Sequence, residues 1–151
     1  MTGTEIIQIF MGSLGSMGFG ILFNVRGIKL LVSSVGGLLS WLLFVLFSKC
    51  IANESVNYFV VALIISLFAE MMARVFKTPA STFITTSLIP LIPGGSLYYT
   101  MVYAFQQSLE AFLQKGIYTL QLAAALALGV IVSNALMRIL NKNKMFRKLN
   151  Y

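Results

Sequence analysis

The feature that most constrains this chain is a series of long apolar runs, separated by short breaks that hold most of the charges. An α-helix needs about 20 apolar residues to cross a hydrocarbon core roughly 30 Å thick, and the runs have about this length. Only 10% of the residues are charged, whereas soluble domains average about 25%. The chain could not cover a water-facing surface, so we predict an all-α polytopic membrane protein.

The 151 residues accommodate about five spans and little else. The predicted plain spans cover about residues 4–23, 28–47, 56–76 and 117–140, and a broken span covers about residues 80–113. We expect residues 1–151 to form a single integral membrane domain. Its basic tail, residues 141–151, is predicted to lie on the cytoplasmic side, because blocks of Lys and Arg beside a span prefer the anionic leaflet there.

Small residues recur at four-residue spacing in the first run, at Gly12, Ser16 and Gly20. In lipid, such a spacing lets two helix backbones approach closely. The pattern therefore indicates a tight helix-helix contact, and a flexible gating segment is the alternative.

All three prolines lie in or just before the predicted broken span, at Pro79, Pro90 and Pro93. Proline removes a backbone donor and disfavours the helical conformation in the residue before it. Two glycines follow Pro93 directly. We therefore predict a half-helix over 80–88, a non-helical break through Gly95 and a second helix over 96–113, so that one of the five helices is broken at Pro90–Gly95.

The start of the second half-helix is a candidate carboxylate site. Irregular backbone survives at membrane depth only where protein or a water-filled cavity satisfies its polar groups, and half-helix N-termini in many transporters face anionic substrate groups. We expect the N–H groups of residues 94–97, which are Gly94, Gly95, Ser96 and Leu97, to bind a carboxylate. Hydroxyl-bearing residues flank the break and fit a cavity: Ser81, Thr82, Thr85, Thr86, Ser87, Ser96, Tyr98, Tyr99, Thr100 and Tyr103. The alternative is a packed kink whose hydroxyls bond to their own backbone.

Glu70 and Arg74 stand four residues apart near the end of the third run, with the acid first. This is the favourable order for an ion pair on one helix face. A local pair that anchors the helix end is one interpretation, because Arg can reach the interface from there. Proton coupling through Glu70 and substrate contact through Arg74 are the others, because ionisable groups within spans often have a function.

Composition also excludes several kinds of chemistry. The chain has no His, no Asp and a single Cys, Cys50, so it cannot build a Ser-His-Asp site, a two-His metal site or a thiolate cluster. We therefore expect no enzymatic activity, no metal and no other cofactor. The net charge of +7 does not indicate nucleic-acid binding, because the charges punctuate apolar runs instead of clustering on one face of a soluble module.

The distribution of basic residues predicts the orientation in the membrane. With five crossings and a cytoplasmic C-terminus, the inner side holds Arg26, Lys29, Arg74, Lys77, Arg138, Lys142, Lys144, Arg147 and Lys148. The outer side then holds only Lys49 and Lys115, which is nine basic residues against two. Cytoplasmic loops carry the excess of Lys and Arg, so we predict an N-terminus outside and a C-terminus in the cytoplasm.

Three stretches resemble the threonine/serine exporter (ThrE) family. They are Ala69–Ala80 (AEMMARVFKTPA), Ile89–Tyr98 (IPLIPGGSLY) and Phe23-Asn24-Val25 at the first break. The resemblance extends over nearly the whole chain. The length of the chain is similar to that of the small-subunit type, which corresponds to the C-terminal membrane half of the fused exporters. The family positions that it assigns to this sequence are Asn24, Arg74, Pro79, Pro90, Pro93, Gly94 and Tyr98.

The resemblance implies export of small polar carboxylates across the cell membrane, either threonine and serine or, as in two-subunit relatives, dicarboxylates such as succinate. It also implies a larger partner subunit with its own membrane half and a cytoplasmic domain. The candidate substrate pathway comprises Asn24, Arg74, Pro90, Pro93, Gly94, Gly95, Ser96 and Tyr98, with Glu70 as the candidate for proton coupling. The alternatives are a structural subunit of a partner transporter and a homo-oligomeric channel.

Overall fold

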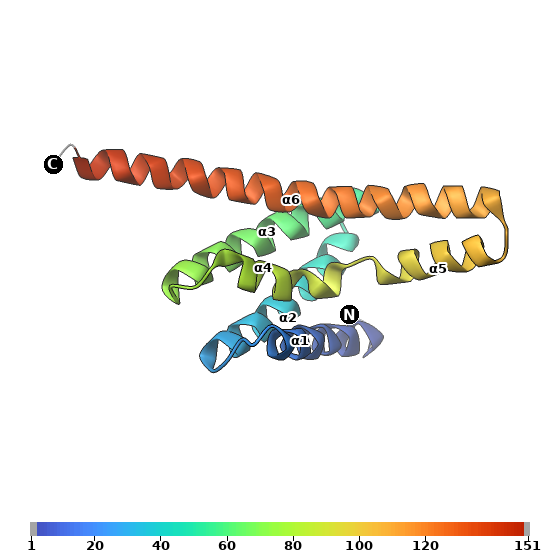
Figure 1. The fold of residues 1–151 in the computed structure, drawn as a ribbon, viewed down its shortest axis with the longest axis horizontal. Coiled ribbons are helices and arrows are strands. Elements are labelled where there is room, and N and C mark those ends of the chain that lie inside the picture. Colours follow the sequence, from blue (N-terminus) through green and yellow to red (C-terminus); the bar gives the residue numbers. More distant parts are fainter. Residues whose placement is uncertain (1–2, 150–151) are drawn as a thin grey trace.

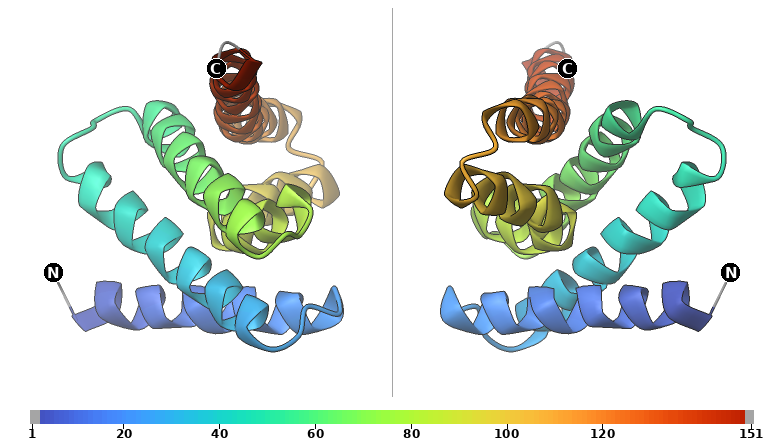
Figure 2. Two further views of the ribbon diagram at one scale, coloured as in Figure 1. Left: turned by 90° about the vertical axis from the view of Figure 1, so that its left-hand side faces the viewer. Right: turned by 90° about the vertical axis from the view of Figure 1, so that its right-hand side faces the viewer.

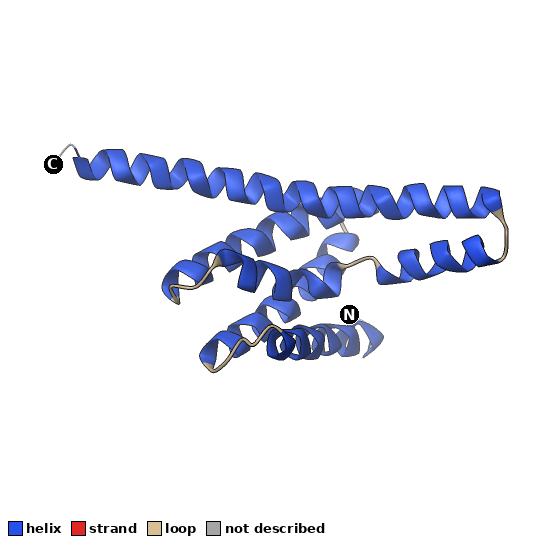
Figure 3. Cartoon of the chain, in the orientation of Figure 1, coloured by secondary structure: helices blue, strands red, loops and turns tan. Residues whose placement is uncertain are grey.

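The computed structural model describes residues 3–149, and of residues 141–149 only the backbone. The described chain is helical without any strand (Figure 3). Its elements are α1 (Gly3–Leu22), α2 (Ile28–Ser48), α3 (Glu54–Val75), α4 (Ala80–Leu88), the 3₁₀-helix η1 (Ile89–Leu91), α5 (Gly94–Phe105) and α6 (Leu109–Leu149). The predicted all-α class is confirmed.

Four helical stretches in the described part are long and apolar enough to cross a membrane: α1, α2, α3 and residues 109–140 of α6. A fifth candidate is the pair formed by α4 with η1 and by α5, whose axes differ by 61°. These helices confirm a polytopic membrane protein with one bent helix pair.

The relative direction of α3 and α6 indicates whether the bent pair is a broken span or a re-entrant loop. Tyr118 of α6 meets Glu54 at the start of α3, and residues 134–138 of α6 lie beside Glu70 and Arg74 near the end of α3. The two helices therefore run in the same direction (Figure 1). The chain between them must return to the end at which α3 begins, as a broken span does and a re-entrant loop does not.

The second half of the broken span is shorter than the sequence predicts. We expected a helix over 96–113, but α5 ends at Phe105 and α6 begins at Leu109. Gln107 has a positive φ of 56°, and the N–H of Ser108 bonds to the carbonyl of Tyr103. This αL turn closes α5. Ser at a helix start with Glu110 in the first turn is a common signal for a new helix, and the prediction missed it.

The contact between α1 and α2 depends on the small residues of both helices. A Cβ atom added at Gly12 would lie 3.3 Å from Trp41 Cβ and 3.4 Å from the Gly37 carbonyl oxygen. One added at Gly37 would overlap the buried side chain of Ser16. The small residues of the first run therefore make a tight helix-helix contact, as predicted.

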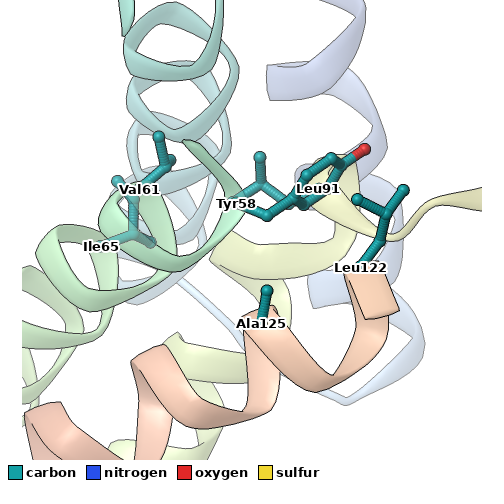
Figure 4. Packing of buried hydrophobic residues seen from close by; sticks show 6 residues of the cluster. All are labelled: Tyr58, Val61, Ile65, Leu91, Leu122 and Ala125. Atoms are coloured by element: carbon teal, nitrogen blue, oxygen red, sulfur yellow. The ribbon is translucent and has the colours of Figure 1, made fainter. Parts of the chain in front are cut away.

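A second close contact joins α3 to α6 and encloses the main apolar core. A Cβ added at Gly129 of α6 would lie 2.7 Å from the carbonyl oxygen of Phe59. The core residues drawn in Figure 4 come from α3 (Tyr58, Val61, Ile65), η1 (Leu91) and α6 (Leu122, Ala125). Leu91 is fully buried among them. The 3₁₀ turn before the break is thus anchored in the centre of the protein.

By contrast, α5 lies at the margin of the molecule. None of its residues is buried, and it packs mainly on α6, where Thr100 Oγ1 and Thr119 Oγ1 are 3.1 Å apart. The hairpin of α5 and the start of α6 extends to one side of the other helices (Figure 1). In the end-on views, α1 and α6 lie on opposite sides of the bundle, with α2, α3 and α4 between them (Figure 2).

The connections alternate between the two ends of the bundle. The α1–α2 turn, the α3–α4 turn and the C-terminus lie at one end, on the left of Figure 1, and the N-terminus and the α2–α3 connection lie toward the other. At that other end, Lys49 Nζ forms an ion pair with Glu5 Oε2 at 3.3 Å.

Candidate functional site

The break between α4 and α5 is built from Pro90 and Pro93. The N–H of Ile92 donates to the carbonyl of Ile89 and closes the 3₁₀ turn. Ile92 itself is extended (φ −61°, ψ 125°), as expected for a residue before proline. Regular helix resumes at Gly94, so the irregular stretch ends earlier than the predicted break through Gly95. The first half-helix has the predicted bounds, 80–88.

Two of the four predicted donors at the start of α5 are already used within the backbone. The N–H of Gly94 donates to Ile92 O (2.6 Å), and that of Leu97 donates to Pro93 O (3.0 Å). The N–H groups of Gly95 and Ser96 have no partner in the described part of the chain, and no side chain caps the helix. Nothing lies within 4 Å of a Cβ added at Gly94 or Gly95. The site therefore offers two open donors at the positive end of a helix dipole.

The hydroxyl groups flanking the break do not line one cavity. Thr86 and Ser87 are fully buried; Thr86 Oγ1 donates to the carbonyl of Thr82 at 2.9 Å, and Ser87 fills the space above Gly36 of α2. Tyr98 is 65% exposed and stacks edge-on against Tyr99. On the α4 side, Ser81, Thr82 and Thr85 share a pocket of about 230 Å³ with Phe23. Thr86 and Ser87 are thus packed in the interior, whereas Ser81, Thr82 and Thr85 line a pocket on the α4 side.

The backbone conformation at the first break explains the presence of asparagine at position 24. Asn24 adopts a positive φ of 59°, a conformation that Asn tolerates better than most residues. Its N–H donates to Ile21 O, and the N–H of Val25 donates to Gly20 O, which closes the end of α1. Pro79 similarly starts α4, because its carbonyl accepts a bond from the N–H of Thr82.

Glu70 and Arg74 form the predicted pair on α3, with Glu70 Oε2 3.6 Å from Arg74 Nη2. Both side chains also line a pocket of about 210 Å³ against Asn134, Met137 and Arg138 of α6. The side-chain oxygen of Asn134 is buried and has no hydrogen-bond partner within the described residues. The sequence does not single out Asn134, because no local pattern shows which helix faces it.

Two further pockets lie toward the opposite end of α6. One, of about 560 Å³, is lined by Ala52, Asn53, Glu54, Ser55, Tyr118 and Gln121. There the Tyr118 hydroxyl donates to Glu54, and Lys115 Nζ lies 4.8 Å from the Tyr118 ring centroid. The other, of about 250 Å³, lies in the α5–α6 turn between Tyr103 and Phe112.

The predicted site residues thus fall into three places. Residues 90–98 lie at the break, Asn24 ends α1, and Glu70 with Arg74 faces α6. Across the described residues, no group of three or more His, Cys, Asp or Glu side chains could hold a metal ion.

Apolar helices with one bent pair, and polar pockets between the helices, define a multi-pass α-helical membrane protein of the kind that moves small solutes. The sequence model of the family described as Threonine/Serine exporter, ThrE, matches residues 8–136. The chain therefore belongs to the ThrE family. No curated protein and no solved structure matches it.

Proposed function

We propose that this chain is the membrane subunit of a threonine/serine exporter and corresponds to the small-subunit type of the family. The observation that carries the proposal is the family match, which extends from α1 through most of α6 and includes both halves of the broken span. A transport role also agrees with the absence of His and Asp from the sequence.

The substrate pathway that we propose passes the break between η1 and α5. The open N–H groups of Gly95 and Ser96 stand at the positive end of α5, where a carboxylate is favoured. Leu91, anchored in the core, holds the end of the 3₁₀ turn in place. Dicarboxylates such as succinate satisfy the same donors, so they remain the second candidate substrate class.

The proposed orientation has the N-terminus outside and the C-terminus in the cytoplasm. Arg26 lies in the α1–α2 turn, Lys77 lies in the α3–α4 turn, and Arg138 lines a pocket with Arg74 near the end of α3. Both turns lie at one end of the bundle (Figure 1), and we assign this end to the cytoplasm.

The proposed partner is a larger ThrE-like membrane subunit with a cytoplasmic domain. The hairpin of α5 and the start of α6 supports this, because it exposes Tyr98, Met101, Phe105 and Leu109 and because α5 packs mainly on α6. Without such a partner, these side chains face membrane lipid or a second copy of the chain.

Efflux by a Gly95→Leu variant tests the proposed pathway. The added side chain meets open space within the chain, so the protein should insert and assemble normally while the carboxylate site is blocked. Efflux of radiolabelled threonine, serine and succinate from preloaded cells should fall to background. The matched control is Gly18→Leu in α1, which also has nothing within 4 Å and should transport normally.

Two results would support the competing interpretations. If Gly95→Leu loses membrane assembly first, and efflux only as a consequence, the chain is a structural subunit. If vesicles that contain the chain alone show uncoupled flux or conductance, it forms a homo-oligomeric channel.

A further inference from the structure

A pocket lined mainly by polar side chains lies between the ends of α3 and α6. Glu70 and Arg74 line it from α3, and Asn134, Met137 and Arg138 line it from α6. Toward the middle of the bundle, the two helices approach closely, because a Cβ added at Gly129 would lie 2.8 Å from Ala62 Cβ. The pocket is therefore a blind recess at one end of the interface.

The charges around the recess favour an anion. Among the described side chains, two guanidinium groups and one carboxylate line it, which leaves one positive charge in excess. Glu70 pairs with Arg74 at 3.6 Å, whereas Arg138 has no ion pair among the residues described. Arginine holds a carboxylate through two parallel N–H···O bonds, so a carboxylate ligand would match Arg138.

The recess also presents acceptors that need a donor. Asn134 Oδ1 is buried without a hydrogen bond, and a buried polar atom in that state costs about 1–3 kcal/mol. Glu70 is only 19% exposed and brings carboxylate oxygens to the same recess. An ammonium group supplies three donors and would satisfy both residues.

The size restricts the ligand further. The volume of about 210 Å³ is below the roughly 300–1,000 Å³ usual for pockets that hold drug-sized ligands. A ligand with a carboxylate, an ammonium group and a small polar side chain fits these limits.

We propose that this recess binds the α-carboxylate and α-ammonium groups of the exported amino acid before it reaches the break, with Arg138 holding the carboxylate and Asn134 and Glu70 holding the ammonium group. This rests on the proposed function. It adds a first binding position on the cytoplasmic side and gives Asn134 and Arg138 a role in recognising substrate.

Two variants and a ligand series test the assignment. Arg138 is exposed, so Arg138→Gln should fold normally, and Asn134→Leu keeps the side-chain size while removing the acceptor. Equilibrium binding of radiolabelled L-threonine is measured on the full chain in phosphatidylcholine nanodiscs, and threonine uptake is measured in inside-out vesicles. The control is Arg26→Gln, which removes an exposed basic residue from the same end of the bundle but outside the recess.

Arg138→Gln should weaken threonine binding and raise the KM for uptake about tenfold or more, the effect expected from losing a charge-assisted hydrogen bond. The weak binding of threonine methyl ester, which lacks the carboxylate, should not change. Asn134→Leu should weaken threonine binding but leave 3-hydroxybutyrate, which lacks the ammonium group, unaffected. Arg26→Gln should behave as wild type.

Unchanged threonine binding in Arg138→Gln would overturn the proposal. An equal loss of affinity for threonine, threonine methyl ester and 3-hydroxybutyrate would overturn it as well, because it would indicate a structural defect. The recess would be a lipid headgroup site if phosphatidylglycerol competes with threonine in wild type and Arg138→Gln removes only lipid binding. If wild-type vesicles transport no threonine, the proposed function fails. The binding measurement in nanodiscs then tests the recess separately. Threonine binding by the wild type that is lost in Arg138→Gln supports the proposed recess. Threonine binding by both proteins, or by neither, overturns it.

Discussion

Gly37 and Gly95 have the same side chain but different surroundings. Gly37 is buried where α1 crosses α2, and any Cβ there would overlap Ser16. Gly95 has open space on its Cβ side and lies in the first turn of α5, two residues after Pro93. The first glycine permits two backbones to pack, and the second leaves a helix N-terminus accessible, so substitutions at the two positions should affect assembly and transport respectively.

Glu70 is the residue to test for coupling to a proton gradient, because it lies in the recess with Arg74 and Arg138. Glu70→Gln keeps the shape of the side chain and removes its ability to carry and release a proton. We expect the dependence of efflux on the pH gradient to become flat, while the amount of protein in the membrane stays unchanged. The measurement is efflux at several imposed gradients.

A second carboxylate provides the control for this change. Glu110 is exposed at the start of α6, where its Oε1 accepts a hydrogen bond from Gln114 Nε2 at 3.5 Å. Glu110→Gln should keep the wild-type response to the gradient. If Glu70→Gln keeps it as well, Glu70 has no part in coupling, and its ion pair with Arg74 and its proposed contact with the ammonium group remain.

At the scale of helices, the features that could be predicted from the sequence are those set by neighbouring residues. Pro90 and Pro93 act on their immediate neighbours, so the first half-helix and the position of the break could be predicted closely. The turn at Gln107 is also local. However, Ser108 and Glu110 are a weak helix-start signal within a continuous apolar run, so the prediction merged α5 and the start of α6 into one helix.

Pairing between helices could not be predicted in the same way. Asn134 and Glu70 are 64 positions apart, and they line one recess only because α3 and α6 pack in parallel. The burial of Ser87 likewise depends on Gly36 of another helix. Helical periodicity shows which residues share a face, but not which helix covers it.

The bend between η1 and α5 depends on Pro93, and this can be tested directly. In Pro93→Ala the position regains an N–H and residue 92 is free to become helical, so α4 and α5 should straighten from their 61° bend. Spin labels at positions 81 and 101, in a Cys50→Ser background, should move apart in double electron-electron resonance. Efflux should fall at the same time, because the start of α5 loses its open donors.

Pro79→Ala is the comparison for this variant. Pro79 precedes the first residue of α4, where proline interrupts no helix. Its replacement should leave the label distance unchanged. An unchanged distance in Pro93→Ala would show that core packing around Leu91, and not the proline, sets the bend.

For the molecule as a whole, the parallel course of α3 and α6 has a consequence for topology. If both cross the membrane, the bent pair between them must cross it once as well, which gives five crossings and places the two termini on opposite sides. The number of crossings does not show which terminus lies outside. The direction comes from the distribution of Lys and Arg, which is a property of the sequence and not of the packing.

Labelling of Cys50 measures the direction. Cys50 is exposed, beside the Lys49–Glu5 ion pair at the end of the bundle assigned to the outside. A membrane-impermeant maleimide should label it on intact cells. In a Cys50→Ser background, a cysteine replacing the exposed Lys77 in the α3–α4 turn should react only after permeabilisation. The opposite pattern, with Cys50 protected and position 77 labelled on intact cells, would invert the topology and move the recess at Arg138 to the outer face.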